Sequence, residues 1–286
     1  MTVEHKRIIS LRDEINTKEL DDETIRIYLI QIEQLLPKPT KTLYIDADSI
    51  IYYIAYSPTN SDMCEPEEGS FIGDKIDIDL KESYYSLVHD IVASCRKESL
   101  MGNMIRFKDF KLVYTPSTNF RYDIFPDYKK SRIDKKESDE LIYLKSQVKK
   151  EGIIIDGVEA DDVVAYYSRR GHPIASGDKD VIYGVEGNHY YYHAKHRTVI
   201  KTSKDEASKF VLLQTLAGDS TDDIPGISGI GMKTKLLDKI DNPTFDDVIK
   251  IYESKSLTKE DAILTRRLVG LDQWKGKRRG VKLWNY

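Results

Sequence analysis

Apolar and polar positions along the chain predict short strands separated by helical segments. Apolar runs suited to buried strands lie at 43–45, 110–114, 152–156 and 173–176. Between them, apolar residues recur three or four positions apart, as on one face of a helix. Strands that alternate with helices form a mainly parallel sheet. The pattern therefore predicts an α/β fold in which the strands end at a common edge.

The segments outside this alternation are mostly helical or rich in turns. Residues 1–40 have helical spacing, and they either pack on the rest of the chain, which is the more common outcome, or bind a partner. Residues 58–78 are polar and turn-rich, which indicates a loop or a short hairpin. Residues 137–151 are expected to form an exposed helix, and residues 241–270 are expected to be helical.

Composition narrows the class of protein without fixing a partner. The chain has 286 residues, 40% apolar and 32% charged, and no apolar run reaches membrane-spanning length. The N-terminus lacks the apolar core of a signal peptide. Cys64 and Cys95 have no metal-ligand spacing and fit a reducing compartment. His193 and His196 are expected at the surface. A globular protein of the cytoplasm is the expectation.

The net charge of −4 does not exclude a polyanionic partner. Eight of the acidic residues fall into the clusters described below, and setting them aside turns the formal charge to +4. If those acids hold divalent cations, the remaining surface is mildly basic. The bulk charge therefore neither requires nor rules out binding to nucleic acid.

Acidic residues gather at the predicted strand-to-helix junctions. They are Asp46, Glu159, Asp161, Asp162, Asp178 and Asp180. Because open α/β sheets place their sites at the carboxyl ends of the strands, these side chains are expected to meet at one edge. Acids in a first helical turn also suit a well-capped helix. Three acids in four residues at 159–162 exceed what a cap requires.

The stretch Leu216–Leu237 joins acids with glycines. Asp219 and Asp222 are spaced i and i+3, so both carboxylates can converge on one cation. A helix is expected to start at Met232, and a helix N-terminus next to glycines can bind phosphate. The alternative is a loop that only turns the chain. The glycines are Gly226, Gly229 and Gly231, and the basic residues that follow are Lys233 and Lys235.

Basic and aromatic side chains are mixed over residues 120–136. Basic side chains contact phosphates, and interleaved aromatic rings can stack on bases. The alternative is a solvated charged segment, which is what most charge runs are. The residues of interest are Arg121, Tyr128, Lys129 and Arg132.

Five motifs, in this order, make the chain resemble the 5′-nucleases of phages and bacteria, a family of 5′→3′ exonucleases and flap endonucleases. They are YIDADS, FPDYKKSR, GVEADD, SGDKD and LAGDSTDDIPGISGIGMKTKLL, and they span about residues 43–237. The size and the separate N-terminal segment are most similar to a phage exonuclease. The resemblance implies a PIN-like, mainly parallel twisted sheet flanked by helices. It also implies a helical arch at about 120–150 and a helix–three-turn–helix DNA-binding element at 213–240.

The resemblance further implies a division of the chain and a set of site residues. The parts would be an N-terminal helical segment at 1–40, a nuclease core at 41–205, and a C-terminal helical region at 206–286. Two or more Mg²⁺ or Mn²⁺ ions would be bound by Asp46, Glu159, Asp161 and Asp178, with Asp162 in or near that set, and by Asp180, Asp219 and Asp222. Catalysis would rest on Lys129, Arg121 and Asp178. DNA would be contacted by Arg121, Tyr128, Lys129, Arg132, Gly226, Gly229, Gly231, Lys233 and Lys235, with K⁺ as a further ion at the Gly226–Gly231 turn.

One departure from the family pattern stands at the end of the second predicted strand. Family members usually have an Asp there, whereas this chain has Tyr114-Thr115-Pro116-Ser117. Either a neighbouring acid compensates or one metal ion is held more weakly. Asp48 has no role that the resemblance assigns.

The expected function is a metal-dependent 5′→3′ exonuclease or structure-specific flap endonuclease that hydrolyses phosphodiester bonds of DNA, with RNA–DNA hybrids as a further substrate. Its settings would be replication, primer removal or DNA degradation. The expected partner is DNA with a free 5′ end, flap or nick. No membrane is expected, and the protein is expected to be a monomer, with a replication protein as a candidate partner.

Two alternatives stay open. The run Asp46-Ala47-Asp48-Ser49 resembles the nucleophile motif of haloacid-dehalogenase-like phosphatases, in which Asp46 would attack phosphate. The other alternative is a non-catalytic nucleic-acid-binding relative, which the missing acid near Thr115 motivates.

Overall fold

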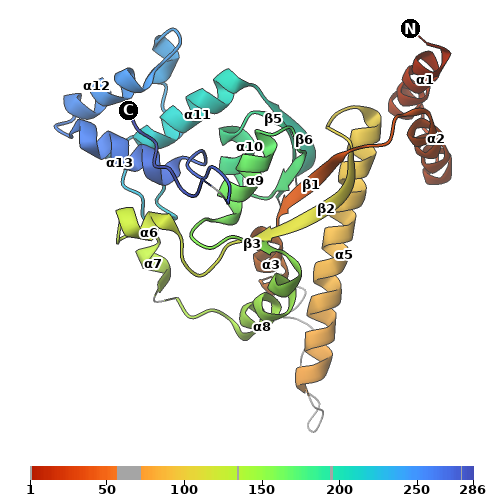
Figure 1. Cartoon of the computed structure of the whole chain (residues 1–286), viewed down its shortest axis with the longest axis horizontal. Coiled ribbons are helices and arrows are strands. Elements are labelled where there is room, and N and C mark those ends of the chain that lie inside the picture. The colour runs from red at the N-terminus through yellow and green to blue at the C-terminus, as the bar shows by residue number, and fades with distance from the viewer. Residues whose placement is uncertain (1, 57–71, 134, 194–195, 278) are drawn as a thin grey trace.

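A six-stranded sheet in this computed structural model positions all the other elements (Figure 1). The structure describes residues 2–56, 72–133, 135–193, 196–277 and 279–286. The strands are β1 (Lys41–Asp46), β2 (Phe107–Tyr114), β3 (Ile153–Ile154), β4 (Ile174–Ser176), β5 (Gly187–His193) and β6 (His196–Thr202). Their order is β3-β2-β1-β4-β5-β6, and every neighbouring pair is parallel except β5 and β6. The predicted mainly parallel sheet is confirmed.

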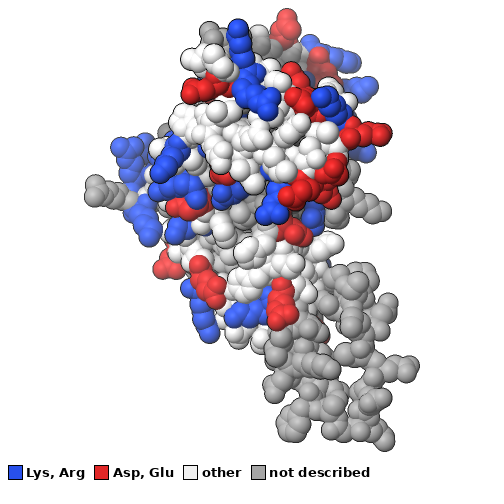
Figure 2. Space-filling model, turned by 90° about the vertical axis from the view of Figure 1, so that its right-hand side faces the viewer, with Lys and Arg blue, Asp and Glu red and all other residues white. Residues whose placement is uncertain are grey.

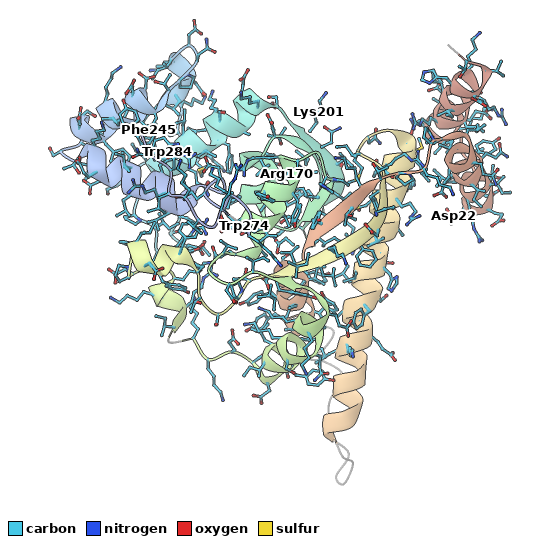
Figure 3. All side chains as sticks on the ribbon, in the orientation of Figure 1. Asp22, Arg170, Lys201, Phe245, Trp274 and Trp284 are labelled. Carbon is cyan, nitrogen blue, oxygen red and sulfur yellow. The ribbon has the colours of Figure 1, made fainter. Side chains whose placement is uncertain are left out.

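Alternation of side chains along β1 supplies both faces of the sheet. Leu43 and Ile45 point into one cluster of buried residues, whereas Tyr44 points into another on the opposite face. The first face is covered by α3 (Asp48–Ala55), α5 (Ile72–Met101) and α8 (Asp139–Val148). The second face is covered by α9 (Ala160–Ser168) and by the C-terminal tail around Trp274 (Figure 3). The sheet is therefore buried on both sides, as parallel sheets require.

The N-terminal residues form a helical hairpin, as their spacing predicted. Helix α1 (Val3–Thr17) and helix α2 (Asp22–Leu35) each begin after a side-chain cap, Thr2 and Asp21 respectively. They pack on the C-terminal end of α5, where Leu100 joins their own small cluster. Nε of Arg12 donates a hydrogen bond of 2.7 Å to the carbonyl oxygen of Leu100. The segment therefore packs on the rest of the chain, which was the more common of the two outcomes considered.

The C-terminal helices form a cluster of their own beside the sheet. They are α11 (Lys204–Ala217), the short 3₁₀ helix η2 (Leu237–Lys239), α12 (Phe245–Ser254) and α13 (Lys259–Val269). Figure 3 shows Phe245 next to Trp284 from the tail, and their ring centroids are 4.6 Å apart. Residues 241–270 are thus helical as expected, with a break between two helices.

Two sequence predictions about the flanks of α5 and α8 are wrong. Residues 72–78 belong to α5 rather than to a loop, while residues 57–71, including Cys64, lie outside the described residues. Helix α8 is not exposed all round, because Leu141, Leu144 and Val148 are buried against α3 and α5. The charged residues of this segment suggested an exposed helix, but its apolar residues form a stripe that packs on the core.

The segment predicted as a helical arch contains short helices instead of a continuous one. It carries α6 (Phe120–Ile124), α7 (Lys130–Ile133), α8 and the 3₁₀ helix η1 (Lys149–Glu151). The Pro126 position separates the first two, since proline disfavours a helix running through it. Residues 120–150 are therefore largely helical but in short pieces, and the arch itself stays a prediction.

Surface charge was also part of the sequence argument. On the face drawn in Figure 2, Lys and Arg are interspersed with Asp and Glu over the described residues. Over the same part of the chain, every helix is too short or too polar to cross a bilayer. His193 is exposed, as predicted, and the side chain of His196 lies outside the described part.

Candidate functional site

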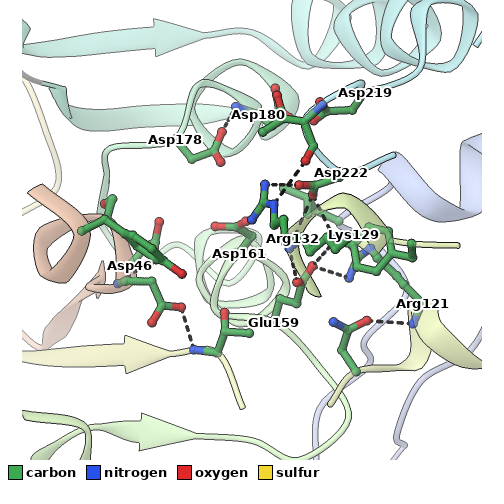
Figure 4. A pocket seen from close by; sticks show the side chains of 18 of the residues that line it. Asp46, Arg121, Lys129, Arg132, Glu159, Asp161, Asp178, Asp180, Asp219 and Asp222 are labelled. Carbon is green, nitrogen blue, oxygen red and sulfur yellow. Dashed lines mark hydrogen bonds and ion pairs between the residues drawn. The ribbon is translucent and has the colours of Figure 1, made fainter. Parts of the chain in front are cut away.

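A pocket of about 740 Å³ lies where the carboxyl ends of β1, β2 and β4 meet (Figure 4). Nine acidic and six basic side chains line it, so its formal charge has an excess of three negative charges. The acids are Asp46, Asp48, Glu137, Glu159, Asp161, Asp178, Asp180, Asp219 and Asp222. The structure therefore brings together seven of the eight acids singled out in the sequence, and the exception is Asp162.

Strand ends and helix starts deliver these acids to the pocket. Asp46 is the last residue of β1, and Asp178 follows β4 as the N-cap of α10 (Lys179–Gly184). Oδ1 of Asp178 accepts a hydrogen bond of 2.7 Å from the backbone N–H of Asp180. Glu159 is the N-cap of α9 and forms a capping box. The same local turns that start the helices thus aim carboxylates at one edge of the sheet.

The carboxyls on the β1 and β4 side hold their protons unusually tightly. Asp46 is only 4% exposed, and burial followed by the charge of Asp48 raises its pKa to about 7. Burial followed by the charge of Asp178 raises the pKa of Asp180 to about 7 as well. Burial also raises the pKa of Asp161 well above its ordinary value. Crowded carboxyls of this kind ionise at lower pH when a cation offsets their charge.

The donor atoms suit a hard divalent cation. Oδ2 of Asp180 accepts a hydrogen bond of 2.7 Å from Gln214, but its buried Oδ1 has no partner. Carboxylate oxygens are what Mg²⁺ and Mn²⁺ prefer. Within the described residues, no three His, Cys, Asp or Glu side chains have the spacing of a ready-made metal site. Because Mg²⁺ usually keeps several waters and binds one or two carboxylates, the residues still fit such ions.

Basic side chains lie on the other side of the pocket, within reach of the acids. Nζ of Lys129 is 2.5 Å from Oε1 of Glu159 and 3.5 Å from Oδ2 of Asp222. Burial opposes the charge on Lys129, but the two carboxylates outweigh it and raise its pKa. Arg132 forms an ion pair with Asp222 (Figure 4). Both cations are therefore charged and held beside the acid cluster.

The roles predicted for Arg121 and Asp162 do not agree with their burial, although Arg121 is among the residues that line the pocket. The Arg121 side chain is 2% exposed and Asp162 is 0% exposed. The guanidinium donates to both oxygens of Asp162, at 2.7 and 3.0 Å, and to the carbonyl oxygens of Leu268 and Gly270. Burial opposes its charge, but the carboxylates of Asp162 and Glu159 raise its pKa. The pair holds the pocket wall together, and its burial argues against the predicted contacts with phosphate and metal.

Tyr128 requires a similar correction. Its side chain is 1% exposed, so its ring cannot stack on a base. Its hydroxyl lies 2.8 Å from Glu159 and 3.1 Å from Asp222, and it can donate its proton to either carboxylate. Tyr128 therefore fixes two acids of the pocket rather than binding DNA directly.

The glycines that follow Asp222 do not share one environment. A Cβ on Gly226 would lie 2.1 Å from the carbonyl carbon of Ala217, so close backbone packing requires this glycine. A Cβ on Gly229 or Gly231 would meet nothing within 4 Å. The exposed residues nearby are Lys233 and Lys235. Only Gly229 and Gly231 are therefore open to a ligand, and none of the three glycines lines the pocket.

The helix predicted from Met232 is absent. Residues 232–236 form turns, and only η2 follows, with Leu237 as its buried anchor. A segment this short gains little from helix formation unless several side chains pack. The predicted helix–three-turn–helix element therefore has its first helix, α11, but lacks the second.

One pocket residue was left without a role at the sequence level. Oδ2 of Asp48 accepts a hydrogen bond of 2.8 Å from the backbone N–H of Thr115, at the end of β2. Oγ1 of Thr115 in turn accepts a hydrogen bond of 3.0 Å from Ala160, at the start of α9. The signal was present in the sequence, because Asp48 follows Asp46 by two residues on the same strand-to-helix turn.

The fold and the acid-lined pocket at the carboxyl edge of the sheet define a PIN-like α/β protein. No protein-family model matches the chain. It is 26% identical over 222 residues to flap endonuclease Xni of Pseudoalteromonas translucida, covering 68% of this chain and 86% of that protein. It is 27% identical over 258 residues to a 5′-3′ exonuclease of Aquifex aeolicus, covering 81% and 82%. The chain is therefore similar to 5′-3′ exonucleases and flap endonucleases over most of its length, as the resemblance of its motifs predicted.

Solved structures support the same fold. The chain superposes on the T5 D15 protein co-crystallised with metal ions with a TM-score of 0.59 and 18% identity, over 82% of this chain and 91% of that one. A complex of the T5 D15 flap endonuclease with DNA and metal ions gives a TM-score of 0.53 and 17% identity, over 82% and 90%. At this identity the likeness concerns the fold.

Proposed function

We propose that this protein is a structure-specific 5′ nuclease that hydrolyses phosphodiester bonds of DNA with the help of Mg²⁺ or Mn²⁺. The observation that carries the proposal is the convergence of seven acids from separate segments on one pocket, next to Lys129 and Arg132. The names of the relatives, flap endonuclease and 5′-3′ exonuclease, support DNA with a free 5′ end as the substrate.

The acids would hold the ions in two groups. Asp46, Asp161 and Asp178 would serve one group, and Asp180, Asp219 and Asp222 the other, with Glu159 between the groups and the basic residues. Divalent ions bound there would lower the pKa of an attacking water and offset charge on the phosphate. The pKa values of Asp46 and Asp180 are raised to about 7. Both side chains would therefore have to release a proton when they bind the ions.

Lys129 and Arg132 would bind and orient the phosphate that is cleaved. Both are already placed by carboxylates of the pocket, so little reorganisation is needed when negative charge develops. Lys129 adopts a backbone φ of 54°, and its N–H donates 2.9 Å to the carbonyl oxygen of Asp222. This unusual conformation in a non-glycine residue fixes the direction of the side chain.

Duplex DNA would lie along the outer turn beside the pocket. The open backbone at Gly229 and Gly231, together with exposed Lys233 and Lys235, suits phosphate contacts. A K⁺ ion at the Gly226–Gly231 turn is part of this proposal. RNA–DNA hybrids are a further proposed substrate, and the proposed setting is replication in the cytoplasm.

The phosphatase alternative is less favoured. A phosphatase that uses Asp46 as its nucleophile leaves the acids at 159–161 and 178–180 without a role, although they line the same pocket. The nuclease names of the relatives also argue against it.

Replacing Asp178 with Asn tests the proposal. Asn keeps the size of the side chain but removes a charged oxygen from the metal group. Cleavage of a 5′-labelled flap substrate in Mg²⁺ should fall by more than about 100-fold, because loss of supporting ligands alone already costs 10–100-fold. Binding of the same DNA, followed by fluorescence anisotropy in Ca²⁺, should persist.

A matched control is Asp109→Asn on β2, whose side chain is 49% exposed and outside the pocket. It should cleave like the unchanged protein. No cleavage by the unchanged protein in Mg²⁺ or Mn²⁺ would favour the non-catalytic alternative, and full activity of the Asp178 variant would remove the proposed site.

A further inference from the structure

The end of β2 contributes no acid to the pocket, which leaves a gap among the acids that line it. The ends of β1 and β4 carry Asp46 and Asp178 into the pocket, and the turn after β3 carries Glu159. Strand β2 lies between β1 and β3 in the sheet, but it ends in Tyr114-Thr115-Pro116-Ser117 without a carboxylate. The pocket therefore receives no acid from β2, which is one of the two strands that border β1.

Asp48 occupies this gap from a different element. It is the first residue of α3, and its Oδ2 accepts 2.8 Å from the N–H of Thr115, which directly follows β2. Its own N–H donates 3.3 Å to Oδ1 of Asp46, so the two carboxylates lie on the same side of the pocket. The side chain of Asp48 is 21% exposed and lines the pocket, so solvent and ions can reach it.

We propose that Asp48 supplies the carboxylate that β2 lacks, as an oxygen ligand, direct or through one water, for the divalent ion held by Asp46. This inference rests on the proposed function of the pocket. It assigns to Asp48 a role that neither its motif nor the resemblance gives it.

Lys149 does not neutralise Asp48 enough to prevent this role. Nζ of Lys149 donates 2.7 Å to the carbonyl oxygen of Thr115 and lies 3.5 Å from Oδ1 of Asp48. Both side chains of the pair are partly exposed, and ion pairs in contact with water are weak. The lysine is thus placed mainly by the backbone, and Asp48 remains able to face a cation.

A purely structural role for Asp48 is the competing explanation, and Asn separates the two. In Asp48→Asn, the amide oxygen can still accept from the N–H of Thr115, while the negative charge is lost. The contact that fixes the end of β2 is kept and the proposed ligand is weakened. A second change, Thr115→Asp, returns a carboxylate to the gap from β2 itself, and its oxygen can still accept from Ala160 as the hydroxyl does.

The experiment measures Mn²⁺ binding by the full chain with electron paramagnetic resonance, and cleavage of a 5′-labelled flap across a Mg²⁺ titration. Asp48→Asn should weaken Mn²⁺ binding by about 10- to 100-fold and shift the Mg²⁺ midpoint of cleavage in the same direction. The double variant Asp48→Asn with Thr115→Asp should regain most of the loss. Asp109→Asn is the matched control, and thermal unfolding in EDTA should be similar for all variants.

Unchanged Mn²⁺ binding in Asp48→Asn would overturn the inference, as would a double variant that binds no better than the single one. These outcomes differ from failure of the proposed function. If the unchanged protein binds Mn²⁺ in a manner that depends on Asp48 but cleaves no DNA, the ligand role stands and the nuclease proposal falls.

Discussion

Replacing Arg121 with Met should destabilise the protein severely, because the change leaves a buried carboxylate without its partner. Arg121 and Asp162 are 2% and 0% exposed, and they form two hydrogen bonds to each other. Met fills a similar volume but donates nothing. The carbonyl oxygens of Leu268 and Gly270 lose a donor as well.

The size of the effect follows from this geometry. Removing one partner of a buried pair costs about 3–5 kcal/mol, because the remaining charge cannot be solvated. Lost hydrogen bonds to two carbonyls act in the same direction but do not simply add, since all of them depend on one side chain. A loss of about 3–5 kcal/mol is a large part of the 5–15 kcal/mol by which a typical protein is stable.

Urea unfolding followed by circular dichroism measures this loss. The variant Arg121→Met should unfold at lower urea, and adding Asp162→Asn should restore part of the stability, because the unpaired charge disappears. Arg26→Met is the control, since the pair between Arg26 and Glu23 is 74% and 71% exposed and should matter little. A stable Arg121→Met protein that has lost only DNA cleavage would refute the structural assignment and return Arg121 to the phosphate.

Three further predictions concern pH and the glycines. Burial raises the pKa of Asp46 from 3.8 to about 7, so between these pH values the folded state binds a proton that the unfolded state has lost. The contribution of this group to stability is therefore fully present below about pH 4 and is lost as the pH rises through 7. In EDTA, the free energy of unfolding should therefore fall less steeply between pH 4 and pH 8 in Asp46→Asn than in the unchanged protein, and Mg²⁺ should offset the fall, whereas equal slopes for both proteins would contradict the prediction. Gly226→Ala should cost about 1–3 kcal/mol, because its Cβ would meet the backbone of Ala217 at 2.1 Å. Gly231→Ala should leave stability within about 0.5 kcal/mol but weaken duplex binding in an anisotropy assay, and unchanged binding would remove this turn from the DNA surface.

The sheet and the acids were predictable because both follow from local order in the chain. A buried strand ends at a turn, and acids such as Asp46 and Asp178 lie at or just after the end of such a strand. Parallel pairing then fixes that the ends meet, whatever the detailed packing. The sequence alone was sufficient to predict seven of the nine acids that line the pocket, and it also included Asp162, which does not line it.

The partners of those acids were not predictable in the same way. Arg121 meets Asp162, which lies 41 residues later, and Lys129 meets Asp222 in another part of the chain. No periodicity within either segment records such a pairing. A basic residue next to aromatic residues therefore suggested DNA binding, although Arg121 is buried and its partners lie within the protein. The failed helix at Met232 has the same origin, since tertiary packing anchors only Leu237 there.

The charges of the pocket determine how it can bind phosphates and divalent ions. A pocket with an excess of three negative charges repels the phosphates that the proposed function requires it to receive. Lys129 and Arg132 cannot reverse this alone, because Glu159 and Asp222 already take up their charge. Two divalent ions bound in the pocket would more than offset the excess, while Lys129 and Arg132 stay placed by Glu159 and Asp222. Binding of DNA at the pocket should therefore depend on the ions much more strongly than binding at Lys233 and Lys235, which stand exposed outside it.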